Sequence, residues 1–294
     1  MAESVIRDTD VSSKPALRLW RHLRRDRAGL LGLILLLGIA AGVIFGPLVT
    51  PYNPIEPNLS EAFQPPGSGH VFGTDQLGRD LLARILAGAR ASLFSGLGAL
   101  AVSLVLGVPM GLMSGYAGGL WDNGLMAAIE VLMSFPGVLL ALLAIAILGP
   151  GQRNLVLAVG LASTPVFARL VRGSTLGLKE QEYVIAARAL GASASRVALR
   201  HVLPGCVSPI VVIAVLRLGT TIVTVAGLGF LGLGGDPALP EWGAMLSQGQ
   251  EFLRRAPHIV LVPGLAILLT VLAVNMFGDA FADALNPRLQ SDRR

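Results

Sequence analysis

The sequence is poor in charge, aromatic residues, cysteine and lysine. Charged residues make up only 14% of the 294 residues and aromatic residues only 5%. A soluble domain carries about a quarter charged residues, so a water-soluble fold is not expected. Cys206 is the single cysteine and cannot form an intrachain disulfide. Lys14 and Lys179 are the only lysines, and neither follows a glycine-rich stretch, so the sequence has no recognisable phosphate-binding loop.

The sequence also lacks any recognisable set of catalytic residues. The four histidines are scattered, without the spacing or clustered carboxylates of a metal site. We therefore predict no metal site, no catalytic residues and no bound cofactor, which argues against an intramembrane enzyme. The net charge of +5 comes without a basic patch interleaved with aromatic residues, so nucleic acid is not an expected partner. A membrane protein has such an excess of basic over acidic residues when lysine and arginine collect in its cytoplasmic loops.

Uncharged runs dominate the remainder, with 53% hydrophobic residues and 36 glycines. Runs of about 20 residues can cross a bilayer, and abundant glycine favours close helix packing. We predict an all-α membrane protein with six transmembrane helices. Their approximate ranges are 29–50, 91–121, 125–148, 154–170, 207–228 and 256–278. A cleaved signal peptide is the alternative for the first range, although its apolar run is longer than usual for one.

The distribution of basic residues predicts the orientation. Of the 23 basic residues, 16 fall before the first span, between Arg169 and Arg200, or after the sixth span. The positive-inside rule therefore places both termini in the cytoplasm. The expected organisation is a cytoplasmic basic N-terminus (1–28), the first span (29–50), an extracytoplasmic segment (51–90), a five-helix core (91–281) with a cytoplasmic loop over 179–204, and a cytoplasmic tail (282–294).

The loop between the fourth and fifth spans has the pattern of two short helices. Residues 182–190 are rich in alanine and should be helical, and Gly191 supplies the left-handed residue that ends a helix. Ser193 can cap a second helix running to about His201, before Pro204 opens the next span. Such a slim helix suits a groove on another protein, whereas composition alone would also fit an interfacial helix on anionic lipid.

The order of residues favours docking, because the loop resembles the "EAA" loop of ATP-binding-cassette (ABC) importer permeases. The matching positions are Glu182, Ala186, Ala187, Gly191, His201, Leu203 and Pro204. A segment after the first span resembles the external motif of dipeptide, oligopeptide and nickel permeases, in the subunit type homologous to the second permease of the dipeptide system. Its characteristic residues are Gly73, Thr74, Asp75, Gly78, Arg79 and Asp80. Further blocks around Arg90, Gly229, Glu241, Pro263 and Asn275 also resemble this family.

The resemblance implies a type I importer permease fold in a bacterial inner membrane. It also implies the partners: a second homologous permease, two ABC ATPase subunits that hold ATP and Mg, an extracytoplasmic substrate-binding protein and the lipid bilayer. The 182–204 loop would be the element that couples ATPase closure to the spans. The expected coupling residues are Glu182, Tyr183, Ala186, Ala187, Leu190, Gly191, Arg196, His201 and Pro204.

Ionisable residues inside spans are costly and mark candidate pathway positions. Glu130 lies in the third predicted span, where the family often has an acid, and structural pairing is its other interpretation. Arg217 lies near the middle of the fifth, where the family usually has a small or apolar residue. It could pair with an acid such as Glu130, snorkel, or line the pathway. Asn275, from the closing motif, completes the set. Pro136, Pro165 and Pro263 either shape the third, fourth and sixth spans or act as hinges.

The expected function is ATP-driven import of di- or oligopeptides by a complex in which this chain is a permease. Nickel, glutathione or another small solute is the alternative within this class. A stand-alone secondary transporter is the alternative outside it, but such proteins often show repeated halves and broken helices with ion ligands. The sequence shows neither, and the docking loop would then go unexplained.

Overall fold

The computed structural model describes residues 26–285, and almost all regular structure in it is helical. Within this range the only β-type pairing is an isolated bridge between Thr74 and Asp80. In chain order the elements are α2 (Arg27–Val49), η1 (Leu59–Glu61), α3 (Leu81–Ala117), α4 (Gly119–Met133), α5 (Gly137–Leu148), α6 (Gln152–Leu178), α7 (Glu182–Ala189), α8 (Ala194–Val197), η2 (Ala198–Val202), α9 (Leu203–Phe230), α10 (Trp242–Gly249), η3 (Gln250–Phe252) and α11 (His258–Leu285). The prediction of an all-α fold is confirmed.

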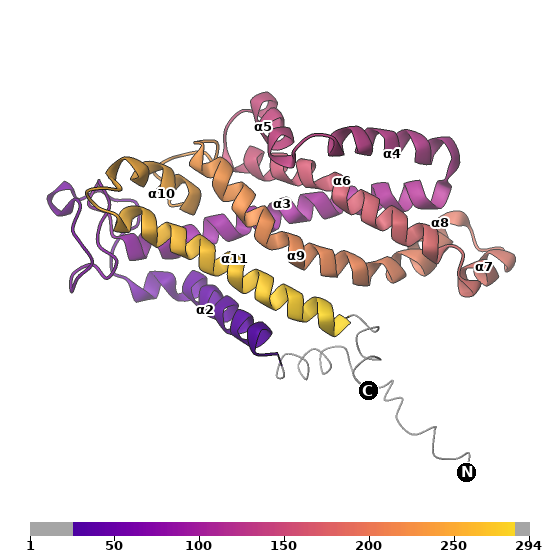
Figure 1. Cartoon of the computed structure of the whole chain (residues 1–294), viewed down its shortest axis with the longest axis horizontal. Helices are drawn as coiled ribbons and strands as arrows, with labels where there is room; N and C mark the ends of the chain where they lie inside the picture. Colours follow the sequence, from indigo (N-terminus) through magenta and orange to yellow (C-terminus); the bar gives the residue numbers. More distant parts are fainter. Residues whose placement is uncertain (1–25, 286–294) are drawn as a thin grey trace, which may run out of the picture.

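Long helices run side by side along the bundle (Figure 1). Helices α3 and α6 share the most extensive packing, with α9 against both, while α2 packs mainly on α11. Gly107, Gly111 and Gly115 recur every fourth residue on the α3 face that meets α6, and a Cβ atom at Gly111 would overlap the carbonyl oxygen of Ala168. Small residues at this spacing allow two membrane helices to approach closely. The abundance of glycine therefore serves helix packing, as predicted.

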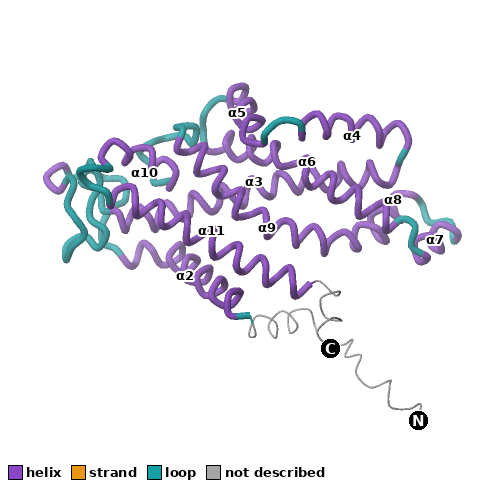
Figure 2. Tube along the Cα trace, viewed as in Figure 1, coloured by secondary structure: helices purple, strands orange, loops and turns teal. Residues whose placement is uncertain are grey.

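The bundle has two distinct ends, which we name by their short helices (Figure 2). The α10 end carries α10, the loop over 50–80 and the turn over 149–151. The α7 end carries α7, α8 and the turn between α3 and α4; α2 starts and α11 ends on the side toward this end but short of it. These ends are the sites of the two motifs that the sequence singled out.

Among residues 26–285, five helices are long and apolar enough to cross a membrane, and a broken pair gives up to six. The break falls in the third predicted span, which was expected to be one helix over 125–148 and is not. Helices α4 and α5 meet at 97° across the break, and Pro136 is the N-cap of α5. Pro136 has no N–H to continue α4, and it disfavours helical backbone at Phe135. Pro165 and Pro263, in contrast, lie inside continuous helices.

Several predicted boundaries need correction. The second span was predicted to begin at 91, but α3 begins at Leu81 and continues for 37 residues, about 55 Å at 1.5 Å per residue. Helix α6 extends to Leu178, eight residues beyond the predicted end. Helix α11 extends to Leu285, beyond the predicted core boundary at 281. The predicted cytoplasmic N-terminus and C-terminal tail include residues 1–25 and 286–294, which lie outside the described residues.

Candidate functional site

The surface hairpin at the α7 end consists of α7, the Gly191 turn and α8. Gly191 has φ +80°, a left-handed conformation. The N–H of Ala192 donates to the carbonyl of Ala187 at 3.1 Å, and the N–H of Gly191 donates to that of Arg188 at 2.9 Å. This is the Schellman arrangement that ends a helix on a glycine. The predicted helix, turn and second helix are confirmed, although the Ser193 hydroxyl makes no capping hydrogen bond to the backbone.

Three valines anchor this hairpin to the bundle. Val184 of α7, Val197 of α8 and Val202 of η2 are completely buried and join a cluster that includes Leu112 of α3 and Val171 of α6. The opposite face exposes Tyr183 and Ile185 beside charged residues, and Leu190 at its tip is 89% exposed. One face of the hairpin is therefore fixed to three long helices, while the other is available to a partner. Sequence reasoning missed that the valines anchor the hairpin to the bundle; the available signal was β-branched residues in an alanine-rich stretch.

The chain passes from α8 into α9 through the π-helix η2. Pro204 lacks an N–H, so it cannot complete an α-helical bond to the carbonyl of Arg200. The N–H of Leu203 instead donates to the carbonyl of Ala198. His201 lies in this turn, with its backbone carbonyl accepting from the Tyr183 hydroxyl at 3.3 Å. Its Nδ1 atom is buried without a hydrogen-bond partner among the described residues.

The nine expected coupling residues all lie in this hairpin or at its junction with α9 (Figure 1). Most are exposed; Ala187 and His201 are half-buried. Arg188, which was not predicted, places its guanidinium 5.3 Å from the centre of the Tyr116 ring at the end of α3. The hairpin thus contacts the spans through packing and through this cation–π pair.

An ion pair that the sequence did not predict ties α4 to α6 near the α7 end. Arg172 donates through Nε and Nη2 to the two carboxylate oxygens of Asp122, at 2.6 and 2.7 Å. The Ser114 hydroxyl of α3 donates to the same carboxylate. Bidentate arginine–carboxylate pairs combine strength with a fixed geometry. The first half of the broken span is therefore held to the helix that leads into the hairpin.

The external motif folds into a buried polar network at the α10 end. Asp75 accepts from Nε of Arg79 at 2.7 Å and lies 3.4 Å from Nε of Arg84. Asp80 caps α3 by accepting from the N–H of Ala83 at 2.7 Å, and its other oxygen lies 2.8 Å from Nδ1 of His70. These side chains are at most 5% exposed. The network joins the loop to the start of α3.

The other motif residues shape the backbone of this loop. Gly73 and Gly78 have φ of +77° and +73°. Thr74 accepts from the N–H of Gln64 at 2.8 Å and donates its hydroxyl to the carbonyl of Glu61. The structure therefore brings all six external-motif residues together, and their contacts are those of a rigid cap.

Helix α10 closes the same end through Glu241. This carboxylate accepts from the N–H groups of Gly243 and Ala244 at 2.9 and 2.8 Å, and from the Ser92 hydroxyl of α3 at 3.3 Å. Burial raises the pKa of Glu241, while the hydrogen bonds to Gly243 and Ala244 oppose this shift. Trp242 donates its indole N–H to the carbonyl of Ile85 at 3.1 Å. Both contacts fasten α10 to α3.

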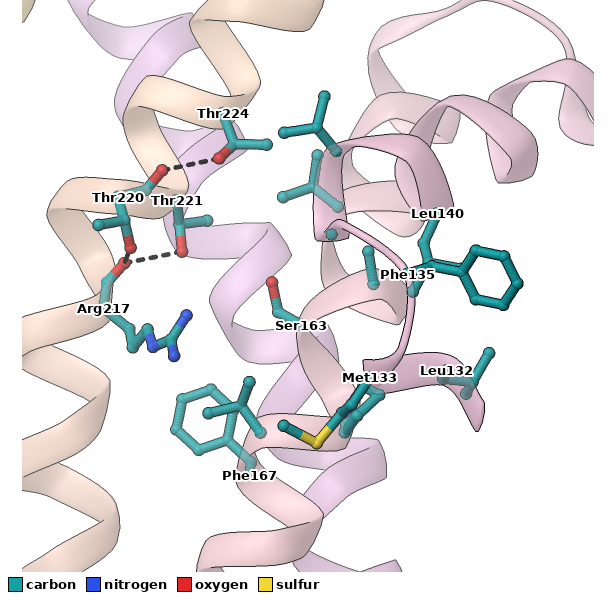
Figure 3. A pocket seen from close by; sticks show the side chains of 16 residues that line it. Leu132, Met133, Phe135, Leu140, Ser163, Phe167, Arg217, Thr220, Thr221 and Thr224 are labelled. Atoms are coloured by element: carbon teal, nitrogen blue, oxygen red, sulfur yellow. Dashed lines mark hydrogen bonds between the residues drawn. The ribbon is translucent and has the colours of Figure 1, made fainter. Parts of the chain in front are cut away.

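A cavity of about 280 Å³ lies part-way along the bundle, beside the break between α4 and α5 (Figure 3). Arg217 of α9 lines this cavity, whereas Glu130 and Asn275 do not. Glu130 lies exposed on α4, and Asn275 approaches Gly219 from α11. Within residues 26–285 Arg217 forms no ion pair, so the predicted alternative of pairing with Glu130 is not observed.

This architecture is the fold of type I ABC importer permeases. An inward-facing methionine ABC transporter, MetNI, matches it with a TM-score of 0.56 at 19% identity, covering 69% of this chain and 96% of that chain. The crystal structure of an amino acid ABC transporter with histidines matches with a TM-score of 0.52 at 16% identity, covering 68% and 93%. At these identities the likeness concerns the fold alone.

Sequence comparison gives the family. Residues 107–291 match the binding-protein-dependent transport system inner membrane component, and residues 15–66 match the N-terminal TM domain of oligopeptide transport permease C. The chain belongs to this family of inner-membrane permeases, in its dipeptide and oligopeptide branch.

Two relatives illustrate this branch. The glutathione transport system permease protein GsiD of Pectobacterium atrosepticum is 45% identical over 292 residues, which cover 98% of this chain and 95% of the relative. The dipeptide transport system permease protein DppC of Alkalihalophilus pseudofirmus is 41% identical over 272 residues, covering 92% and 90%. The predicted ABC importer permease is confirmed, and the stand-alone secondary transporter is not favoured.

Proposed function

We propose that this chain conducts di- or oligopeptides, or glutathione, which is itself a small peptide, through the membrane after delivery by an extracytoplasmic binding protein. Its relatives named for dipeptide and glutathione transport support this substrate class. A second, homologous permease completes the pathway. The chain itself holds no cofactor, and ATP and Mg bind to two partner ATPase subunits.

The observation that carries the proposal is the two-faced hairpin at the α7 end. Tyr183, Ile185 and Leu190 expose apolar surface, which fits the cleft of an ATPase. The buried valines on the other face contact the long helices. Motion of an ATPase can therefore reach α3, α6 and α9 without passing through a flexible linker.

The proposed orientation places the α7 end in the cytoplasm and the α10 end outside. Six of the basic residues lie between Arg169 and Arg200, on the α7 side, where the positive-inside rule expects them. The rigid cap at the α10 end then faces the binding protein. Alternating access follows from rocking of this chain against the second permease around the mid-bundle region.

Replacement of Leu190 by glutamate tests the docking face. Leu190→Glu places a charge on the exposed apolar tip, and its exposure means that the fold should tolerate it. We expect the purified complex to lose its ATPase subunits and reconstituted vesicles to lose ATP-driven peptide uptake. Leu59→Glu is the matched control, because Leu59 is 70% exposed at the α10 end. Full retention of the ATPases by Leu190→Glu would refute the proposed docking face.

A further inference from the structure

The cavity beside the broken span combines one cationic side chain with an otherwise uncharged lining. Its walls come from the α4–α5 break, from α6 and from α9. Arg217 is the only ionisable residue among the lining residues, and it lies near the midpoint of the 28-residue α9. Ionisable groups so deep in a membrane helix usually face a bundle interior or a water-filled cavity, and they mark substrate pathways.

The side chain of Arg217 points from α9 into the space in front of Phe167 and Ser163 of α6 (Figure 3). No carboxylate of residues 26–285 forms an ion pair with it. A guanidinium presents donors in a planar fork and has no acceptor, so this cavity offers a site for an anion with matching geometry.

The neighbouring hydroxyl groups differ in whether they are free to donate a hydrogen bond to an anion beside Arg217. Thr220 and Thr221 donate to the backbone carbonyl of Arg217 at 2.9 and 2.8 Å, and Thr224 donates to that of Thr220 at 2.9 Å. Their protons are thereby engaged along α9. The Ser163 hydroxyl has no hydrogen-bond partner in the described part of the chain and lies on the facing helix. It is a free donor across the cavity from the guanidinium.

The break between α4 and α5 also favours a water-filled pathway at this depth. Residues 134–136 are not helical, and irregular backbone at membrane depth is tolerated only where protein buries it or where it lines a water-filled cavity. Met133, Phe135 and Leu140 around the break add an apolar wall. A volume of about 280 Å³ suits one amino-acid residue better than a whole peptide.

We propose that this cavity is a carboxylate-binding subsite of the translocation pathway. Arg217 holds the carboxylate through paired N–H donors, Ser163 adds a hydroxyl donor, and the apolar wall receives the adjoining side chain. The inference rests on the proposed function for its substrate class, since peptides and glutathione both carry a free carboxylate. It makes Arg217 a residue that favours acids over their amides during passage.

The test uses the complete complex of both permeases and ATPases, with Arg217→Gln, Arg217→Lys and Arg169→Gln in this chain. Arg169 is an exposed arginine of α6 outside the cavity lining, and it is the matched charge-removal control. The first measurement, made without binding protein, is the thermal shift produced by N-acetylalanine against N-acetylalanine amide. The second is ATP-driven uptake of trialanine and glutathione by proteoliposomes supplied with binding protein.

We expect the acid, and not the amide, to stabilise the wild-type and Arg169→Gln complexes. Arg217→Gln should abolish this shift and lower uptake by about tenfold or more, the range typical of a lost charged hydrogen bond. Arg217→Lys should restore part of both, because it keeps the charge without the fork.

Three outcomes would overturn the inference. The first is an equal response of the wild type to acid and amide. The second is unchanged uptake and acid preference in Arg217→Gln. The third is loss of the second permease from the Arg217→Gln complex, which would show that Arg217 pairs with an acid of that subunit. Failure of the wild type to import either peptide would instead refute the proposed function, while the acid-specific thermal shift would still decide the subsite.

Discussion

The loop at the α10 end is held by buried charged side chains, whereas the hairpin at the α7 end is held by buried valines and has an exposed apolar tip. At the α10 end, Asp75 lies between Arg79 and Arg84, and all three are nearly inaccessible. At the α7 end, Val184 and Val197 are buried while Leu190 is almost fully exposed. The difference teaches that the α10 end is held together by charge pairs within this chain, whereas the α7 end presents the apolar face that we propose an ATPase covers. Changes should therefore affect folding at the α10 end and assembly at the α7 end.

The largest effect should come from breaking the buried charge network. Asp75→Asn leaves Arg79 and Arg84 buried without their counter-charge, which costs about 3–5 kcal/mol. We expect a large fall in the thermal unfolding temperature of the detergent-purified chain. Glu56→Gln, an exposed change in the same loop, is the control and should have no measurable effect. Equal stability of the two variants would show that the network is not needed for folding.

A second large effect is expected at Gly78. Its φ of +73° already disfavours a side chain, and a Cβ atom there would overlap the carbonyl oxygen of Asn58. Gly78→Ala should destabilise the chain by about 3 kcal/mol or more, because conformational strain adds to overpacking. Thermal unfolding and expression yield in membranes measure this. A variant as stable as the wild type would contradict the close packing of the loop.

Gly191 allows a closer comparison of the two ends. Its backbone conformation is similar to that of Gly78, but its surroundings are open. Its φ is +80°, but no atom lies within 4 Å of an added Cβ. Gly191→Ala should therefore cost only about 1–2 kcal/mol, confined to the hairpin. We expect unchanged global unfolding with reduced ATP-driven uptake, and recovery with Gly191→Asn, which tolerates this conformation. A global loss of stability like that of Gly78→Ala would remove the distinction between the ends.

The smallest effect concerns Glu241, which lies between the spans α9 and α11. Burial raises the folded-state pKa of this carboxyl above its ordinary value. Its contribution to stability is therefore fully present below the unfolded pKa and is lost as pH rises through the raised folded pKa. Thermal unfolding across this window should show a decline in the wild type that is weaker in Glu241→Gln. Glu251→Gln, an exposed control, should follow the wild type.

Local sequence signals predicted much of the fold. The uncharged runs predicted where the spans lie. The Gly191 turn was predicted from its immediate sequence, because a glycine in the left-handed conformation commonly ends a helix. The start of α3 was missed because Arg84 and Arg90 interrupt its apolar pattern, and the pairing of Arg84 with Asp75 in the preceding loop depends on how that loop folds. Pro136 was expected to kink one continuous helix, but the structure has two helices there. The sequence does not reveal whether neighbouring groups satisfy the backbone that a proline frees and so let the helix continue.

Long-range contacts could not be predicted from the sequence in the same way. Asp122 and Arg172 are 50 positions apart, and their pairing depends on the packing of α4 against α6. The cavity likewise depends on three separate helices meeting. Arg217 was a candidate because a charge inside a span is unusual, whereas Ser163 carried no signal. The coupling and pathway roles of the predicted residues stay proposals.

The central claim, that the α7 end docks the ATPases in the cytoplasm, can be tested with a single introduced thiol. Cys206 is the only natural cysteine and is fully buried, so Leu190→Cys or Leu59→Cys supplies one accessible thiol. The measurement is labelling of intact cells by a membrane-impermeant maleimide, followed by crosslinking in the assembled complex. The account predicts that Leu59→Cys labels from outside, while Leu190→Cys labels only after permeabilisation and crosslinks to an ATPase. Labelling of Leu190→Cys in intact cells, without an ATPase adduct, would contradict it.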